Sequence, residues 1–146
     1  MNDMIVAGLN AQVPFAAHAG VTIRKAGLEG GEAVLAVERA QTNHIGSVHA
    51  GALFTLGEAA SGAAMAGAFA DMLAGIRPVA AEANIRYLAI AKGDVAAKAR
   101  IASSTAEVRE TLEREGKARF AIDVELADGA GKQVAQMKVD WHLSRR

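Results

Sequence analysis

The sequence predicts an α+β fold in which a curled antiparallel sheet wraps one long helix. Three observations support this. After Pro78, apolar and polar residues alternate with period two over four long stretches. The run 51–73, rich in alanine and glycine, has the length of a helix, and a short strand hairpin precedes it. A length of 146 residues with 51% hydrophobic content suits a single domain, 1–146, with its own core.

The elements before the long helix follow from local signals. Residues 2–13 predict a short amphipathic surface helix that Pro14 stops. A strand opens at Val21, glycines over 27–31 indicate a turn, and a second strand occupies 33–37.

The helix is predicted from Gly51 to Leu73. Each interior glycine costs about 1 kcal/mol relative to alanine, so an isolated helix of this composition is unstable. We therefore expect it to be buried closely against strands. Its small side chains and the lone acid Glu58 argue against a membrane span.

Each of the four later strands places its apolar residues on one face. Asp128 to Gly131 supplies a hairpin turn before the last strand. The charged segment from Glu107 to Gly116 is either a strand extension plus a turn or one helical turn, and we favour the extension. The apolar faces comprise Val79, Ala81, Ala83, Ile85 and Tyr87, then Val95, Ala97, Ala99 and Ile101, then Phe120, Ile122, Val124 and Leu126, and finally Met137, Val139, Trp141 and Leu143.

Composition excludes several function classes. Sixteen basic and sixteen acidic residues balance, so no surface for nucleic acid or an anionic membrane is expected. The absence of cysteine excludes disulfides, thiolate metal sites and a cysteine nucleophile, and fits a reducing compartment. The first residues, Met-Asn-Asp-Met, lack the features of a secretion signal, so we expect a cytoplasmic protein.

The loop before the helix has the character of a reaction site. It runs Asn-His-Ile-Gly-Ser-Val-His from Asn43 and meets the helix N-terminus at Ala50 and Gly51. Unpaired N–H groups and the macrodipole there favour developing negative charge. Glu58 follows two turns in, within a run that otherwise carries no charge. Taken alone, Glu58 reads more simply as a helix carboxylate paired with a basic residue.

The order of elements, with Asn43, His49, Gly51 and Glu58 at their spacings, resembles the hotdog-fold acyl-CoA thioesterases of the phenylacetate-pathway and 4-hydroxybenzoyl-CoA type. The resemblance covers nearly the whole chain and extends to residues 84–88, 91–94 and 116–126. It implies a hydrolase that releases free acid and coenzyme A from a thioester. A tunnel lined by Ala, Leu and Met side chains suits medium-chain or aryl acyl groups.

The resemblance also implies roles for single residues. Asn43 contacts the thioester or the attacking water, and the amide after His49, here that of Ala50, polarises the carbonyl. Glu58 acts as nucleophile or general base, a choice the sequence leaves open. We expect His49 to hold the loop by hydrogen bonding. The chain departs from the family with alanine at position 50, where glycine is common, and with Ala80 where a hydroxyl is frequent.

Helix geometry predicts a site between two chains. Glu58 lies seven residues beyond Gly51, which is roughly 10 Å along a helix axis. One chain cannot easily present both to the same carbon. We therefore expect Asn43 and the helix N-terminus from one subunit, Glu58 from another, and a homo-oligomer that is a dimer or a dimer of dimers.

Neither a metal nor a separate cofactor is expected. The four histidines lack zinc-motif spacing, and coenzyme A enters only as part of the substrate. Its phosphates could meet Lys92, Lys98, Arg100 or Lys117, of which Lys92 and Lys117 are the predicted contacts, although ordinary solvated strand charges explain all four equally well. The competing functions are a non-catalytic acyl-CoA binding module, a hydratase or dehydratase, and a structural dimerisation domain.

Overall fold

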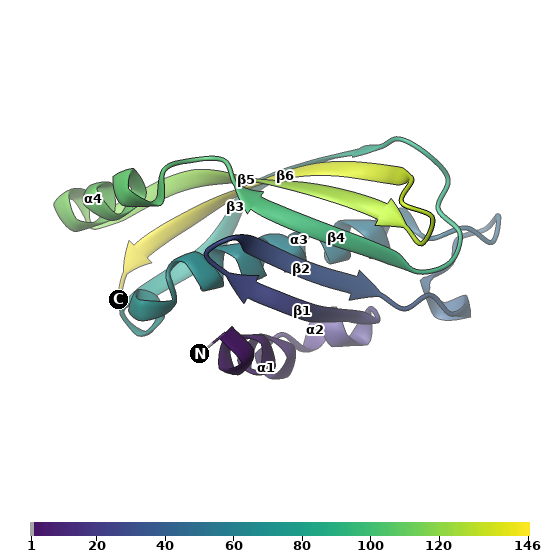
Figure 1. Cartoon of the computed structure of the whole chain (residues 1–146), viewed down its shortest axis with the longest axis horizontal. Helices are drawn as coiled ribbons and strands as arrows, with labels where there is room; N and C mark the ends of the chain where they lie inside the picture. The colour runs from purple at the N-terminus through teal and green to yellow at the C-terminus, as the bar shows by residue number, and fades with distance from the viewer. Residues whose placement is uncertain (1) are drawn as a thin grey trace.

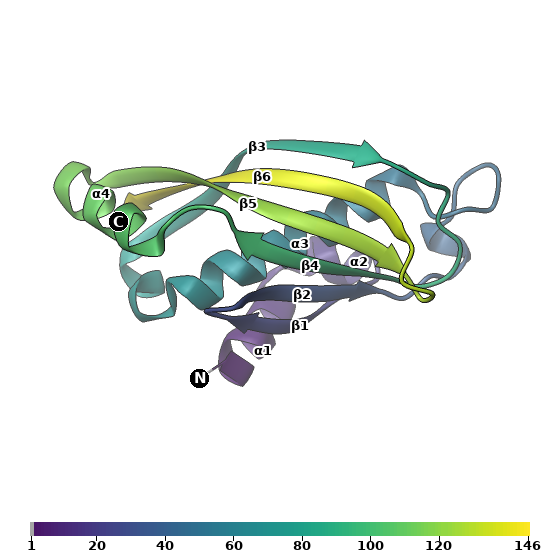
Figure 2. The same cartoon turned by 45° about the horizontal axis from the view of Figure 1, so that its top comes forward.

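Six strands form a single antiparallel sheet in the computed structural model, which describes residues 2–146. The strand order is β1-β2-β4-β5-β6-β3, and helix α3 packs against one face (Figures 1 and 2). The predicted α+β architecture is confirmed. The elements are α1 Asn2–Gln12, α2 Pro14–His18, β1 Val21–Gly27, β2 Gly30–Leu35, η1 Arg39–Gln41, α3 Ala50–Ala68, η2 Ala70–Gly75, β3 Ile76–Tyr87, β4 Val95–Ile101, α4 Thr105–Glu115, β5 Lys117–Asp128 and β6 Gln133–Arg145.

Glycine allows α3 to approach the sheet closely. A methyl group at Gly67 would overlap the backbone of Ala26 and Gly27, and one at Gly31 would overlap the α3 backbone. The prediction of a buried glycine-rich helix is therefore confirmed. Its predicted end at Leu73 is wrong, because Phe69 leaves helical geometry (φ −115°, ψ 28°) and the tighter helix η2 follows.

The two edges of the sheet differ. At β1 the edge is covered by α1, whose Asn10 side chain accepts from the Ile23 N–H at 2.9 Å and donates to the Ile23 carbonyl at 3.0 Å. At the opposite edge, β3 pairs only with β6 within residues 2–146 (Figure 2). A capped edge cannot recruit another strand, whereas an open one can. The predicted stop is confirmed, because α1 ends at Gln12; a second, separate helix, α2, begins at Pro14, since proline fits the first helical turn.

A bulge in β3 corrects one predicted face. The pairing shifts between Ala80 and Glu82, so the alternation changes phase there. Val79 pairs with His142 on the outer face, and does not share the inner face with Ala83. The apolar face predicted for this strand is therefore wrong at its first position, because one inserted residue moves the earlier side chains to the other side.

The segment 105–115 is the helix α4, so the favoured strand extension is wrong. The Ser104 side chain caps its first turn by accepting from the Glu107 N–H at 3.3 Å. Val108 and Leu112, one turn apart, are buried, and Gly116 ends the helix in the left-handed conformation (φ 76°). A cap, an i,i+4 apolar pair and a terminal glycine together specify a helix.

Arg109 fixes α4 to the C-terminal end of α3. Its guanidinium binds both carboxylate oxygens of Asp71, at 2.8 and 3.0 Å, and donates to the Ala68 carbonyl at 2.9 Å. It also lies over the Phe69 ring, 5.2 Å from the centroid. The hydrogen-bonded ion pair with Arg109 holds the pKa of Asp71 below its usual range.

No helix among residues 2–146 is both long enough and apolar enough to cross a bilayer.

Replacing Arg109 with Met should lower the free energy of unfolding by about 1–2 kcal/mol, because a bidentate ion pair, a carbonyl hydrogen bond and a cation–π contact are lost together. Urea unfolding measures this loss. Arg114→Met is the control, since Arg114 reaches only Glu115 at 3.7 Å and is 66% exposed. Equal losses of unfolding free energy in both variants would show that the contacts of Arg109 stabilise the protein no more than those of Arg114.

Candidate active site

The Asn43 side chain organises the loop that precedes α3. Its oxygen accepts from the backbone N–H groups of Ile45 (3.0 Å) and Ser47 (3.1 Å), while its NH₂ group donates to the Ser47 hydroxyl at 2.8 Å. The loop is also tied to the segment after β3, because the Val48 N–H donates to the Ala91 carbonyl at 2.8 Å. Only the second N–H of the Asn43 amide is left for a ligand.

His49 is the N-cap of α3. Its Nδ1 accepts from the Gly51 N–H at 2.8 Å, so the neutral ring carries its proton on Nε2. The Gly51 N–H is therefore engaged. The Ala50 N–H makes no hydrogen bond with any residue from 2 to 146. Of the two predicted amide donors, the structure leaves only that of Ala50 free, at the positive end of the helix dipole.

Glu58 lies on α3 and is partly buried. Its carboxylate forms no ion pair with any residue from 2 to 146, so it is not the paired surface acid that the simpler interpretation predicts. Burial raises the pKa of Glu58 from its usual 4.5. Behind it, the buried Ser61 hydroxyl donates to the Glu58 carbonyl at 2.7 Å and accepts from the Trp141 ring N–H at 3.0 Å, which fixes this turn of helix to β6.

Ala50 and Glu58 are eight residues apart on α3, roughly 12 Å along its axis. At its N-terminal end α3 meets β3 through a hydrogen bond between Tyr87 and Ala50, but the two elements share few other contacts. Two aromatic side chains at this border are exposed: Tyr87, on the α3 side of β3, is 49% exposed, and Phe54, on α3, is 37% exposed. An apolar border beside the open edge is a surface that a second chain can cover.

The other predicted positions are more scattered. Ala80 pairs with Trp141 and lies on the inner face of β3, without the hydroxyl that the family often has there. Lys92 follows β3 at the end of the sheet that holds the α3 N-terminus, whereas Lys117 begins β5 at the other end. A strand of 12 residues spans about 40 Å, so one chain cannot bring both lysines to the same diphosphate.

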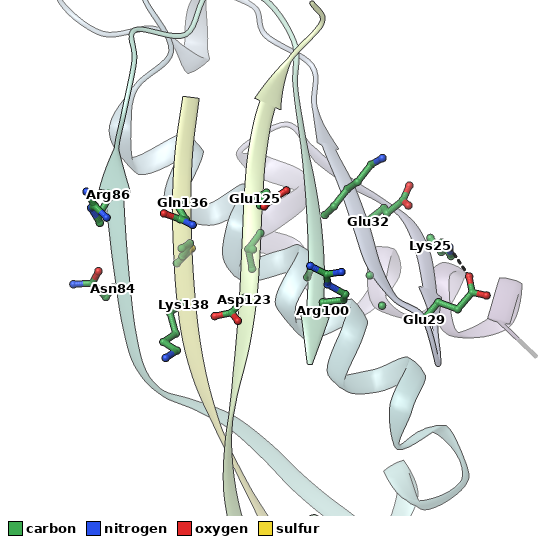
Figure 3. Close-up of a pocket in the computed structure, with 16 residues that line it drawn as sticks. Lys25, Glu29, Glu32, Asn84, Arg86, Arg100, Asp123, Glu125, Gln136 and Lys138 are labelled. Carbon is green, nitrogen blue, oxygen red and sulfur yellow. Dashed lines mark hydrogen bonds and ion pairs between the residues drawn. The ribbon is translucent and has the colours of Figure 1, made fainter. Parts of the chain in front are cut away.

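A charged hollow of the molecule lies elsewhere. It has a volume of about 580 Å³ and lies on the outer face of the sheet, away from α3 (Figure 3). Charged side chains from β2 to β6 line it, among them Arg100, Asp123 and Lys138. None of the residues predicted for the reaction borders it. Within residues 2–146, no three His, Asp or Glu side chains are grouped as metal ligands.

Sequence reasoning missed three contributors to this site. Ser47 completes the hydrogen bonds of Asn43, Ser61 supports the turn of Glu58, and Tyr87 donates from its hydroxyl to the Ala50 carbonyl at 3.1 Å. Ser61 carried a readable signal, since a lone hydroxyl in an alanine-rich helix needs a partner when buried. Tyr87 carried none, because its contact joins residues 37 positions apart.

Glu58→Gln should stabilise the protein at neutral pH. The folded pKa of Glu58 is above its unfolded value, so the folded state binds this proton more tightly and stability falls as pH rises through the folded pKa. The melting temperature of the Gln variant should exceed that of the wild type at about pH 7.5, and the gain should vanish at about pH 4, where Glu58 is protonated. Glu110→Gln, at an exposed position of α4, is the control. A gain that persisted at low pH would contradict this account.

Comparison with known proteins identifies the family. The profile described as "Domain of unknown function (DUF4442)" matches residues 2–143, while a search of curated proteins finds no match. Among solved structures, the chain is similar to PA5026 of Pseudomonas aeruginosa, a protein of unknown function and probable thioesterase, with 25% identity, a TM-score of 0.84 and coverage of 99% of this chain and 95% of that one. It is also similar to E. coli PaaI from the phenylacetic acid degradation operon (19%, TM-score 0.75, coverage 98% and 91%) and to the thioesterase SAV0944 of Staphylococcus aureus (18%, 0.73, 90% and 99%). The chain has the hotdog fold of these structures, and it belongs to the DUF4442 family.

Proposed function

We propose that this protein is an acyl-CoA thioesterase that hydrolyses a medium-chain or aryl acyl-CoA to the free acid and coenzyme A. One observation carries the proposal: the helix that offers the free Ala50 N–H also holds Glu58, a partly buried carboxylate that forms no ion pair with any residue from 2 to 146. The thioesterases among its structural relatives, and PaaI with its phenylacetic acid operon, support this chemistry and an aryl substrate.

The Ala50 N–H supplies the electrostatic part of the reaction. A thioester carbonyl gains negative charge as water or a carboxylate adds to it, and a fixed donor stabilises that charge more than the ground state. His49 caps the helix through Gly51 and so fixes the direction of the neighbouring donor. The second N–H of Asn43 is available to the thioester or to the attacking water.

Glu58 supplies the base or the nucleophile. Both routes need an ionised carboxylate, and a pKa raised by burial makes that carboxylate a stronger base. As a base, it removes a proton from water as the oxygen attacks the carbonyl carbon. As a nucleophile, it forms a mixed anhydride that water then cleaves. In both routes the thiolate of coenzyme A leaves and takes up a proton.

The site is completed by a second chain. Two β3 edges paired about a two-fold axis would run antiparallel, and their α3 helices would lie side by side. The Ala50 N–H of one chain would then approach Glu58 of the other. The same pairing brings the Lys117 end of one chain beside the Lys92 end of its neighbour, where the two lysines can share the coenzyme A phosphates.

A non-catalytic acyl-CoA binding module is the second candidate. Asn43 is largely engaged within its own loop, and β3 offers no hydroxyl at Ala80 to orient a water. Such a protein would bind acyl-CoA without turnover.

Thiol release from short, medium, long and aryl acyl-CoAs separates these candidates. We expect turnover of medium-chain or aryl substrates, and a loss of roughly a hundredfold or more in Glu58→Gln, the scale for a positioned acid or base. Calorimetric titration of the same substrates into both proteins is the control for binding. Saturable binding with no wild-type turnover would establish the binding module, and no binding at all would leave a structural dimerisation domain.

Mixing two inactive variants tests the shared site. Ala50→Pro removes only the free N–H, because proline suits the first helical position and His49 already has the extended geometry (φ −64°, ψ 138°) that must precede it. It should lower kcat by about 10²–10³. Thr105→Pro, at the first position of α4, is the matched control and should keep activity.

Refolding Ala50→Pro together with Glu58→Gln should restore about a quarter of wild-type activity, since half of the dimers are mixed and each contains one intact site. Activity no higher than that of either parent would show that both groups act within one chain.

A further inference from the structure

We infer that Tyr87 is a positioning residue of this site: its hydroxyl holds the Ala50–Gly51 peptide and thereby aims the free Ala50 N–H. The inference rests on the proposed function, in which that N–H binds the thioester oxygen. Tyr87 does not touch the reacting atoms in this assignment. It acts through the backbone that carries the donor.

The placement of Tyr87 follows from the sheet. It is the last residue of β3 and pairs with the buried Ala135, so its ring lies on the α3 side. The bulge near Ala81 sets this phase, because it moves the odd-numbered residues that follow it to the inner face. From there the hydroxyl reaches the first carbonyl of α3 at 3.1 Å.

The Ala50–Gly51 peptide is held at both of its polar atoms. Its oxygen accepts from Tyr87, and its N–H, that of Gly51, donates to His49 Nδ1 at 2.8 Å. A peptide group is planar, so two opposed hydrogen bonds fix the orientation of the plane. The nitrogen of the free Ala50 N–H is bonded to the Ala50 Cα, which adjoins this peptide. The direction of the N–H is therefore set by the peptide plane and by the helical backbone angles of Ala50.

The two restraints come from different parts of the molecule. His49 belongs to the same loop as the donor and moves with it. Tyr87 belongs to the sheet, and within residues 2–146 its hydroxyl makes the one side-chain hydrogen bond between β3 and α3. Without it, no side-chain hydrogen bond among residues 2–146 joins the helix N-terminus to β3, and the loop keeps its backbone bonds, such as that from the Val48 N–H to the Ala91 carbonyl. Because β3 is also the edge proposed for subunit pairing, Tyr87 links the assembled dimer to the donor.

The chemistry of the phenol suits this role. Desolvation raises the pKa of Tyr87 above its usual 10.0, so the hydroxyl is protonated at neutral pH and remains a donor there. The ring is 49% exposed, which leaves it at the border of the site and not in the core. Replacing it with phenylalanine therefore deletes the donor while it preserves the ring.

Tyr87→Phe is the test, with Thr55→Val as the matched control. Thr55 also donates a hydroxyl to a carbonyl of the same helical turn, that of Gly51 at 2.9 Å, but it ties α3 only to itself. We expect Tyr87→Phe to lower kcat about tenfold with KM within about twofold of wild type, the pattern for a lost transition-state interaction. Melting temperature and oligomeric state should match the wild type. Thr55→Val should retain wild-type kcat. A kcat for Tyr87→Phe within twofold of wild type would overturn the inference.

A second readout does not depend on activity. The ¹³C chemical shift of the Ala50 carbonyl should move upfield in Tyr87→Phe, and the Gly51 amide should exchange faster with solvent. If the wild type hydrolyses no thioester, the proposed function fails, while the carbonyl shift still decides whether Tyr87 holds the peptide. An unchanged Ala50 carbonyl shift overturns the positioning role. If Tyr87→Phe does not fold, the change in the wild-type Ala50 carbonyl shift on exchanging H₂O for D₂O tests the same hydrogen bond, and no change would overturn the positioning role.

Discussion

The close contact between α3 and the sheet is the constraint on which the rest of the structure depends. At Gly31 and Gly67 the backbones of helix and strands approach so closely that no side chain fits between them. Glycine weakens an isolated helix, so this helix exists because the sheet packs around it. The same contact orients the helix: it packs mainly against β1, β2 and β4 and shares few contacts with β3 at the open edge.

The two edges of the sheet differ, because the β1 edge is covered and the β3 edge is open. Asn10 satisfies the backbone of Ile23 and closes the β1 edge, whereas β3 keeps a free edge and exposed apolar side chains such as Val79 and Tyr87. Soluble proteins seldom leave a long edge strand uncovered. The proposed two-fold assembly would cover the free edge and would bring together groups that lie roughly 12 Å apart along one helix.

Polar groups at the α3 N-terminus are arranged for one free donor. Asn43 and Ser47 stabilise the loop, His49 engages the Gly51 N–H, and of the two backbone amides of Ala50 and Gly51 only that of Ala50 has no partner among residues 2–146. Glu58 is the complementary case, a carboxylate whose burial without a cation is unfavourable for folding. Unpaired polar groups that lower stability are common at functional sites, where the transition state provides the missing partner.

The sequence by itself determined the α+β class, the strand periodicity, the long buried helix, and the likeness of Asn43, His49 and Glu58 to a thioesterase motif. These follow from local patterns that need no knowledge of neighbours. The α4 helix also carries local signals, namely the Ser104 cap, the Val108 and Leu112 pair and the terminal Gly116, which outweigh the favoured strand extension. The tertiary structure alone decided the phase of β3, which a single bulge resets. It also decided which amide is free and that Tyr87 reaches Ala50. Those outcomes depend on contacts between residues distant in sequence, which no spacing rule encodes.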